Sequence, residues 1–358
     1  MTTNHKYYLD LAFQLAEKNL GKTKLNPSVG VVITKNNSVI STGVTSVNGR
    51  PHAEFNALNK KKNFKDATLY TTLEPCTHFG ETPPCVNIIK DKKIKHVFYG
   101  FNDPDKRTHR KAKKKLKSYN IKVNKIENKK FKNFYKSYFF NKKFKLPFIS
   151  AKIAISKDYF TINKKTKWIT NERSQKISHL LRSQSDCIFS TSKSINSDNS
   201  LLNCRITGLN NFKPDLFIID LNLKLKNKLL LTKIINKRKT FLITYKKNEK
   251  YINIFKKKGF KIILIKSLKS KNDFKLMFKL IYKMGYCRVL FETGLTFLNS
   301  LLKNKLINNL YVFQSNNLLN NYGKNNSSPE FLKKIKISKK IKVNLNNDNI
   351  YKKNFNYV

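Results

Sequence analysis

The sequence brings together one imidazole, one carboxylate and two thiols, the residue types that build a catalytic zinc site. His52 and Glu54 are separated by one residue, and Cys76 and Cys85 follow, each directly after a proline. Three protein ligands leave a fourth zinc position open for water, and a carboxylate beside that water can move its protons. We therefore expect His52, Cys76 and Cys85 to bind zinc and Glu54 to act as general acid and base.

A structural zinc site is the alternative for these residues. Such a site needs four protein ligands, and His78 is the one further candidate at a plausible spacing. The order H-x-E…P-C…C is instead typical of zinc deaminases, in which the Glu is not a ligand. There zinc lowers the pKa of water to about 7, and the Glu passes protons to a ring nitrogen and to the leaving amine. The pattern predicts hydrolytic deamination of an amino-substituted heterocycle.

Apolar periodicity and turn residues predict alternating helices and strands around this site. We expect His52 to open a helix, so that His52 and Glu54 project from its first turn. The other expected elements are a helix over 5–20, strands over 29–33, 38–44, 67–73 and 94–100, a helical segment beginning at Pro75-Cys76, and a basic helix from about Thr108. This alternation indicates a three-layer α/β/α domain that ends near Lys145.

A second α/β pattern follows and indicates a mostly parallel sheet. Its expected strands cover 148–155, 187–191, 217–220, 241–245, 262–265 and 288–291, and its expected helices cover 171–182, 272–284 and 294–302. Glu292-Thr293-Gly294 is either a phosphate-binding turn or an ordinary strand–helix connection. Trp168 is either a stacking surface or a core residue, and the residues alone favour the core. The order of the polar, basic segment Lys333–Lys353 stays open.

The formal net charge of +53 has two explanations. A charge of this sign favours nucleic acid or another anionic partner, but a binding face would concentrate the lysines on one helix or strip. The lysines instead run through almost the whole length together with many Asn and Ile, which resembles AT-biased coding drift. We favour drift and expect no specific nucleic-acid partner, although the charge suits anionic substrates.

Cysteine usage and hydropathy indicate a soluble protein of a reducing cytoplasm. Cys187, Cys204 and Cys287 are too scattered for a disulfide framework and are expected to be small buried apolar residues. No signal pattern occurs near the N-terminus, and no run approaches the roughly 18 to 20 apolar residues that span a bilayer. We therefore expect no membrane partner.

Asn26-Pro27-x-Val29-Gly30, His52-Ala53-Glu54 and the segment from Thr72 to Cys85 resemble the bifunctional riboflavin-biosynthesis proteins. That family joins a diaminohydroxyphosphoribosylaminopyrimidine deaminase to a 5-amino-6-(5-phosphoribosylamino)uracil reductase, and the long insert between the cysteines is specific to it. The resemblance implies that Asn26 and His78 hold the pyrimidine and ribose side of the substrate. Members usually have Lys or Arg, which suit the substrate phosphate, where this sequence has Glu81. Either a neighbouring lysine substitutes or the loop has drifted.

The second half resembles the reductase domain of the same family, which has a dihydrofolate-reductase-like fold. The segments that carry the resemblance are Pro147-Phe148-Ile149, Lys152, Ser156-x-Asp158, Trp168-Ile169-Thr170, Leu181-Arg182-x-x-x-Asp186 and Ser194…Asp198…Leu202…Arg205. The resemblance implies NADPH contacts at Ala154, Trp168, Ser194, Asp198 and a segment that begins with Gly294, Leu295 and Thr296. It implies substrate contacts at Thr166, Arg182, Leu202, Arg205 and Glu292. Asp158-Tyr159 and Asp220-Leu221 depart from the family's Asp-Gly and Asp-Ser, so this resemblance is looser.

We therefore predict a two-domain α/β enzyme with zinc and NADPH as cofactors. A three-layer α/β/α, cytidine-deaminase-like domain over 1–145 would deaminate 2,5-diamino-6-(5-phosphoribosylamino)pyrimidin-4-one. A dihydrofolate-reductase-like domain over 146–358 would reduce the ribosyl chain of 5-amino-6-(5-phosphoribosylamino)uracil to ribityl. The sequence does not assign a structure to its C-terminal part from about residue 330. We expect a homo-oligomer that acts on a small phosphorylated pyrimidine. One rival is a deaminase with a degenerate reductase half; the other is an RNA-binding nucleobase deaminase, which the long Cys76–Cys85 insert disfavours.

Overall fold

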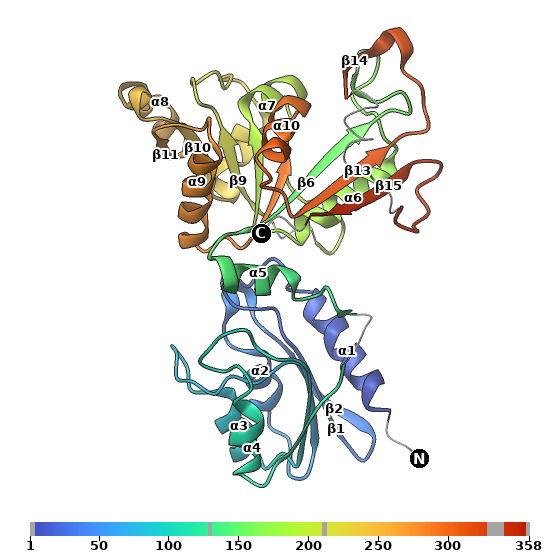
Figure 1. Ribbon diagram of the computed structural model, residues 1–358, viewed down its shortest axis with the longest axis vertical. Coiled ribbons are helices and arrows are strands. Elements are labelled where there is room, and N and C mark those ends of the chain that lie inside the picture. The colour runs from blue at the N-terminus through green and yellow to red at the C-terminus, as the bar shows by residue number, and fades with distance from the viewer. Residues whose placement is uncertain (1–3, 128–130, 210–212, 328–339, 356–358) are drawn as a thin grey trace. The chain divides into compact units, whose positions relative to one another are not determined.

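The chain forms two compact units, Met1–Lys145 and Leu146–Val358, and each has its own main sheet (Figure 1). The computed structural model describes residues 4–127, 131–209, 213–327 and 340–355. In these residues no helix is both long enough and apolar enough to cross a membrane.

The described part of unit 1 holds one five-stranded sheet with the strand order β2-β1-β3-β4-β5. β1 is antiparallel to β2 and β3, whereas β3, β4 and β5 are parallel to one another. The strands are β1 Gly30–Lys35, β2 Ser38–Val44, β3 Thr68–Leu73, β4 His96–Phe101 and β5 Lys122–Lys125. The helices are α1 His5–Glu17, α2 Ala53–Leu58, α3 Cys85–Asp91, α4 Ala112–Lys117 and α5 Lys136–Phe144.

Two glycines let helices approach this sheet closely on opposite faces. A Cβ at Gly30 would lie 1.9 Å from the carbonyl oxygen of Ala12 in α1, and one at Gly43 would lie 2.2 Å from that of Ala53 in α2. Gly43 pairs with Val31, the residue after Gly30, and successive residues of a strand face opposite ways. α1 and α2 therefore cover different faces, which is the predicted three-layer arrangement (Figure 1).

The helix predicted to begin at Pro75-Cys76 is wrong. The segment between β3 and α3 contains no helix, and α3 begins only at Cys85, directly after Pro84. A proline disfavours the helical conformation of the residue before it, so Pro83 and Pro84 disfavour a helix that continues from Cys76 into α3. The two cysteines consequently come from a loop and from the start of a helix.

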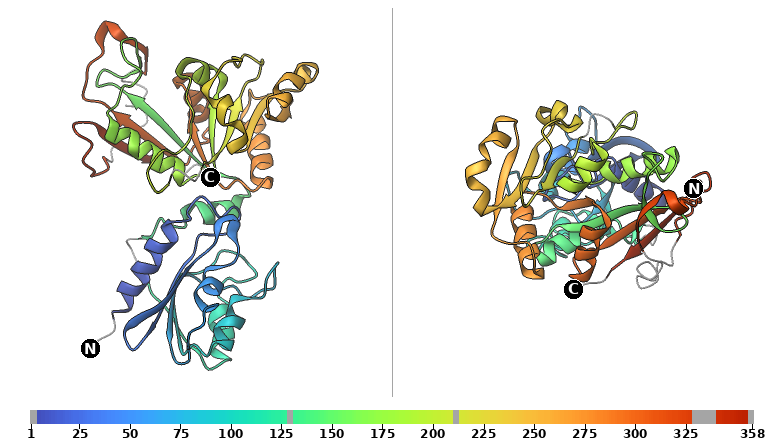
Figure 2. Two further views of the ribbon diagram at one scale, coloured as in Figure 1. Left: turned by 180° about the vertical axis from the view of Figure 1, so that it is seen from behind. Right: turned by 90° about the horizontal axis from the view of Figure 1, so that it is seen from above.

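Unit 2 contains, in its described residues, an eight-stranded sheet with the order β11-β10-β9-β8-β12-β6-β13-β15 and a two-stranded sheet of β14 and β7 (Figure 1 and Figure 2). All pairs of the large sheet are parallel except β13 with β15. The strands are β6 Phe148–Ile155, β7 Phe160–Asn163, β8 Cys187–Thr191, β9 Asp215–Ile219, β10 Thr240–Tyr245, β11 Lys261–Ile265, β12 Arg288–Glu292, β13 Asn309–Gln314, β14 Gly323–Asn326 and β15 Asn349–Asn354. The helices are α6 Glu172–Ser183, α7 Ser192–Asp198, α8 Asn253–Lys257, α9 Lys271–Lys283 and α10 Leu295–Lys303.

Apolar side chains cover both faces of the large sheet. Phe189 of β8 belongs to a cluster with residues of α9 and α10, and its neighbour Ile188 belongs to another with residues of α7 and α8. Alternate residues of a strand point to opposite faces, so the mostly parallel sheet is buried between helices as predicted. The side chain of Asn171 caps α6 by accepting a hydrogen bond from the Ser174 amide at 3.0 Å.

The C-terminal segment whose order was open contributes one strand. β15 lies within Lys333–Lys353 for most of its length and pairs with β13. Residues 333–339 of that segment lie outside the described residues.

Candidate functional site

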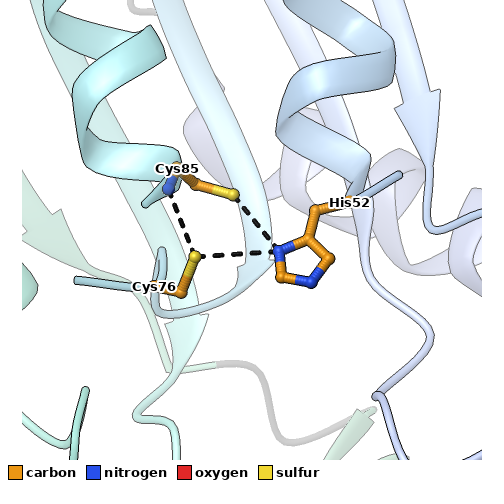
Figure 3. Close-up of side chains that lie close together, drawn as sticks. All are labelled: His52, Cys76 and Cys85. Carbon is orange, nitrogen blue, oxygen red and sulfur yellow. Dashed lines mark hydrogen bonds between the residues drawn. The ribbon is translucent and has the colours of Figure 1, made fainter. Parts of the chain in front are cut away.

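Three predicted ligands converge in unit 1. His52 is the N-cap of α2, Cys76 lies in the loop after β3, and Cys85 is the first residue of α3. The imidazole Nδ1 of His52 lies 3.7 Å from the sulfur of Cys76 and 3.4 Å from that of Cys85 (Figure 3). The potential ligand atoms all lie within 4.8 Å of one another. Segments far apart in sequence thus place one nitrogen and two sulfurs around a common point.

The backbone around the cluster is held by hydrogen bonds. The side-chain amide of Asn56 donates to the carbonyl oxygen of Val44 at 2.7 Å and to the hydroxyl of Ser46 at 2.9 Å, which ties α2 to the end of β2. The Cys85 amide donates to the Cys76 sulfur at 3.2 Å. That bond stabilises a thiolate at Cys76 and fixes the loop against the start of α3.

Glu54 lies beside the cluster and is buried, with 4% of its surface exposed. Burial raises the pKa of its carboxyl group, and the nearby Cys76 raises it further. The hydrogen bond with Cys85 lowers the pKa of the Cys76 thiol to about 4. A raised pKa makes it easier for the Glu54 carboxyl group to hold a proton, which suits a group that must both take up and release one as a general acid and base.

The donor set fits zinc with an open position. Two sulfurs and one imidazole nitrogen are ligands that zinc prefers, and three protein ligands are typical of a catalytic site. Among the described residues, the metal-capable group contains His52, Cys76 and Cys85 but not His78. The His78 Nδ1 instead lies 3.0 Å from the hydroxyl of Thr108. The structural zinc alternative thus lacks its fourth ligand.

Asn26 and Glu81, two positions singled out by the resemblance, both contact the segment that leads to His52. The side-chain amide of Asn26 donates to the carbonyl oxygen of Gly49 at 3.1 Å. Glu81 forms an ion pair with Arg50, with 2.9 Å between Arg50 Nε and Glu81 Oε2. The cation that contacts Glu81 is therefore Arg50. This arginine was not identified from the sequence, although its position two residues before His52 indicated that it lies near the site.

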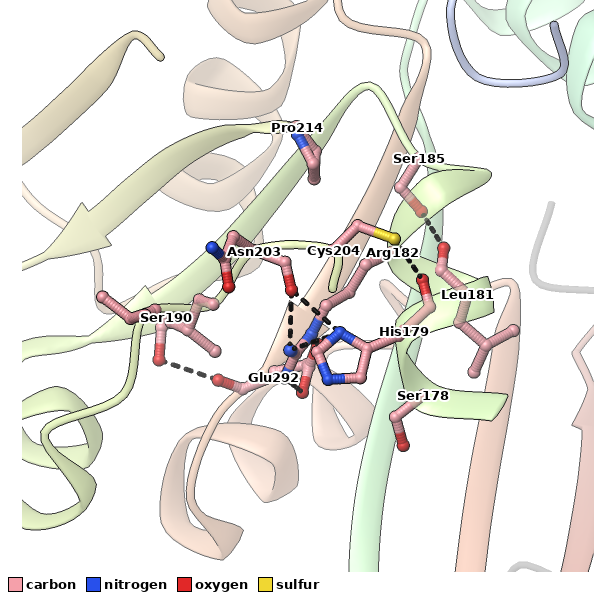
Figure 4. A network of polar contacts seen from close by, with 12 residues as sticks. Ser178, His179, Leu181, Arg182, Ser185, Ser190, Asn203, Cys204, Pro214 and Glu292 are labelled. Carbon is pink, nitrogen blue, oxygen red and sulfur yellow. Dashed lines mark hydrogen bonds and ion pairs between the residues drawn. The ribbon is translucent and has the colours of Figure 1, made fainter. Parts of the chain in front are cut away.

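A largely buried ion pair, with side chains 12% and 9% exposed, lies at the centre of the second group of predicted residues. Arg182 of α6 donates to Glu292 of β12 through two bonds of 2.5 and 2.9 Å (Figure 4). Burial acts to raise the pKa of Glu292, but the charge of Arg182 outweighs it, so this pKa is lowered. Arg182 also donates to the carbonyl oxygen of Asn203 at 3.0 Å, which links the pair to the segment carrying Leu202 and Arg205.

Ser194 of α7 and Gly294, the N-cap of α10, contact each other. The Gly294 amide donates to the Ser194 hydroxyl at 3.0 Å, so the start of α10, with Leu295 and Thr296, lies beside α7. Asp198 is the last residue of α7.

Lys152, which carries the resemblance but was given no role, lies beside this group. It pairs in register with Glu292 on the neighbouring strand, and burial lowers the pKa of its ammonium group. Its signal in the sequence was a single cation within the otherwise uncharged strand β6.

Three predicted residues lie outside these bonded groups. Thr166 donates to the carbonyl oxygen of Trp168 at 2.9 Å, so these two form their own pair. Ala154 packs in an apolar cluster with Phe313. The expectation of a core tryptophan is wrong, because 51% of the surface of Trp168 is exposed. Cys187, Cys204 and Cys287 are buried, as expected.

Breaking the buried pair is expected to destabilise unit 2. In Arg182→Met the largely buried Glu292 carboxylate loses the guanidinium that binds it through two hydrogen bonds, which costs about 3–5 kcal/mol of unfolding free energy. Lys176→Met on the same helix removes an exposed pair with Glu172 and should cost less than about 1 kcal/mol. Urea unfolding of both variants checks this. Equal losses would show that Arg182 is no more important to stability than a surface cation.

His179, also on α6, is expected to make unfolding depend on pH. Burial and the charges of Arg182 and Arg205 lower its pKa to about 4 from 6.5, and its Nδ1 accepts a bond from the Arg205 amide at 3.2 Å. As pH falls from 6.5 toward 4, the unfolded chain takes up a proton that the folded chain excludes, so stability falls. Urea unfolding at several pH values should show a smaller fall in His179→Asn, which can still accept that bond. An equal fall in both proteins would contradict the prediction.

Both halves match known protein families. Residues 2–101 match the cytidine and deoxycytidylate deaminase zinc-binding region, and residues 147–337 match the RibD C-terminal domain. The chain is 32% identical over 317 residues to the riboflavin biosynthesis protein RibD of Aquifex aeolicus, covering 86% of each chain. It is 31% identical over 331 residues to that of Buchnera aphidicola subsp. Baizongia pistaciae, covering 89% of this chain and 88% of the relative.

Solved structures share the fold. RibD of Acinetobacter baumannii gives a TM-score of 0.81 at 23% identity, covering 97% of this chain and 98% of that one. The diaminohydroxyphosphoribosylaminopyrimidine deaminase/5-amino-6-(5-phosphoribosylamino)uracil reductase of Thermotoga maritima gives 0.78 at 23% identity, covering 97% of each. The predicted fold class, a cytidine-deaminase-like domain followed by a reductase domain, is confirmed. The chain belongs to the riboflavin biosynthesis protein RibD family, whose members join a deaminase to a reductase.

Proposed function

We propose that this protein catalyses two successive steps towards riboflavin. Unit 1, residues 1–145, deaminates 2,5-diamino-6-(5-phosphoribosylamino)pyrimidin-4-one, and unit 2, residues 146–358, reduces the product's ribosyl chain to ribityl with NADPH. The observation that carries the proposal is the convergence of His52, Cys76 and Cys85 beside the buried carboxyl group of Glu54.

In the deamination, His52, Cys76 and Cys85 hold the zinc ion. Zinc supplies activation of water as a nucleophile at neutral pH. Glu54 accepts a proton from the attacking water at a carboxylate oxygen and delivers it to the ring nitrogen. It then accepts the remaining proton of the hydroxyl that has been added to the ring carbon and passes it to the amine, which leaves as ammonia while the ring carbonyl forms. Its burial favours this role because a raised pKa keeps the protonated form accessible. Asn26 and His78 contact the pyrimidine and ribose side of the substrate.

In the reduction, we assign the substrate to Thr166, Arg182, Leu202, Arg205 and Glu292, and NADPH to Ala154, Trp168, Ser194, Asp198 and Gly294–Thr296. NADPH supplies the hydride that opens the ribosyl ring. The exposed ring of Trp168 can stack on a planar group. Arg182 and Arg205 can bind the substrate phosphate, for which the planar guanidinium is well suited.

One assay of the purified protein tests both steps. The phosphorylated diaminopyrimidine is supplied with and without NADPH, and ammonia release and NADPH absorbance are followed together. We expect ammonia in both cases and NADPH loss in the second. Ammonia without NADPH loss would support the rival in which the reductase half is degenerate, and no ammonia would overturn the proposal.

We further propose a cytoplasmic homo-oligomer without a membrane or specific nucleic-acid partner. Light scattering of the purified protein tests the oligomer. Binding to RNA that resists high salt and depends on sequence would support the RNA-binding rival, because charge-driven binding weakens steeply as salt rises.

A further inference from the structure

Arg50 is held across the loop that carries the zinc ligands of unit 1. Its Nε lies 2.9 Å from Glu81, and its Nη1 donates to the Thr82 hydroxyl at 2.6 Å. Gly80 also lies beside the guanidinium, since a Cβ built there would be 3.2 Å from Nη2. Thus one side chain contacts three consecutive residues between Cys76 and Cys85.

The same arginine is close to the reacting centre. Only Pro51 separates Arg50 from His52, a Cα distance of at most about 7 Å. The preceding residue, Gly49, accepts the hydrogen bond from Asn26. Arg50 therefore follows the residue that Asn26 contacts and precedes the zinc ligand His52 by two positions.

The ion pair between Glu81 and Arg50 is weak. The Glu81 side chain is 82% exposed, and that of Arg50 is 27% exposed. Ion pairs of exposed groups contribute little to stability, because water and salt screen them. A phosphate offers more acceptor oxygens and more charge than a carboxylate, and arginine binds it through two parallel hydrogen bonds. A phosphate can therefore displace the Glu81 carboxylate from Arg50 at a small cost in free energy.

Other cations near the loop are more firmly engaged. Arg107 makes two bonds to Asp105, of 2.7 and 3.0 Å, and Lys142 makes a third of 3.1 Å. These bonds hold the pKa of Asp105 well below its usual range, led by the contribution of Arg107. The Asp105 side chain is only 13% exposed. A phosphate would have to break a network here, whereas at Arg50 it replaces one exposed carboxylate.

We infer that Arg50 binds the phosphate of the deaminase substrate and that Glu81 holds the guanidinium in place until the phosphate displaces it. The inference rests on the proposed function, since it concerns the substrate of that site. It also gives the chain a cation for the phosphate although Glu81 carries the opposite charge.

Kinetics of Arg50→Met test the inference. For the phosphorylated diaminopyrimidine we expect KM of deamination to rise about 30- to 100-fold with kcat and zinc content unchanged, because a charge-assisted pair is lost. For the same compound without its phosphate, KM of wild type and variant should agree. Glu81→Gln removes the competing carboxylate and should lower KM for the phosphorylated compound about 2- to 5-fold. Arg107→Met is the matched control and should leave both KM values unchanged.

The outcomes separate the inference from the proposed function. No ammonia release by the wild-type protein would overturn the proposed function. A wild type that turns over, with KM of Arg50→Met within about twofold, would overturn the role of Arg50 alone. An equal rise in KM for the phosphate-free compound would also overturn it, because Arg50 would then shape the loop and not bind phosphate. Calorimetry of substrate binding in a Glu54→Gln background, with and without Arg50→Met, gives a readout independent of turnover: the affinity for the phosphorylated compound should fall with Arg50→Met.

Discussion

Glu54→Gln is expected to lower the deaminase kcat by about 10⁴-fold while the zinc content stays at one ion per chain. Acid–base catalysis by a positioned side chain contributes about 10²- to 10⁴-fold, and here one carboxylate serves every proton transfer. Glutamine has nearly the same shape but neither accepts nor releases the proton. Since Glu54 is not a metal ligand, the thiolates and His52 should still bind zinc.

Ammonia release and metal analysis of the same preparation measure this prediction. Glu127→Gln is the control, because Glu127 is an exposed residue that pairs only with Lys125 among its described contacts. It should leave kcat unchanged. A Glu54→Gln protein with near-normal turnover would remove Glu54 from the proton path, whatever its zinc content.

Cys85→Ser is expected to abolish zinc binding and deamination together while reduction in unit 2 continues. A serine hydroxyl stays protonated at neutral pH and is a much poorer zinc ligand than a thiolate. The two remaining ligands cannot complete the three-ligand set, so zinc should fall below about 0.1 ion per chain and activity by more than about 10³-fold. Exhaustive chelation of the wild-type protein should have the same effect, reversed by added zinc.

Cys204→Ser provides the matched control for the loss of a thiol. Cys204 is buried in unit 2, where its thiol donates to the carbonyl oxygen of His179, a bond that a hydroxyl can also make. Its zinc content and deamination should equal those of wild type. Full zinc in Cys85→Ser, or zinc loss in Cys204→Ser, would show that the metal is held elsewhere.

The placement of the few acidic residues agrees with coding drift as the source of the charge. The chain has 21 acidic and 74 basic residues, and several of the acids bind backbone amides. Glu74 accepts three such bonds, from the amides of Asp103, Arg110 and Ala112. Asp186 and Asp220 each accept two. A lysine cannot replace an acceptor, so the acids remain where the fold needs them.

The sequence by itself was enough to predict which residues form the zinc cluster, that the carboxylate of Glu54 lies beside them, and where most strands run. These depend on short-range information: a histidine and a carboxylate in one helical turn, prolines before each cysteine, and apolar runs that a strand must bury. The strands predicted over 38–44, 148–155 and 187–191 match β2, β6 and β8 residue for residue.

Only the tertiary structure decided which distant charges meet. Arg182 and Glu292 are 110 positions apart, and they pair because α6 packs near the end of β12. Lys152 joins them because β6 lies beside β12 in the sheet order, which no local pattern encodes. The pairing of Arg50 with Glu81 likewise depends on the path of a loop that prolines keep from becoming helix. Local spacing specifies local chemistry, whereas contacts between elements follow from how the chain buries its apolar surface as a whole.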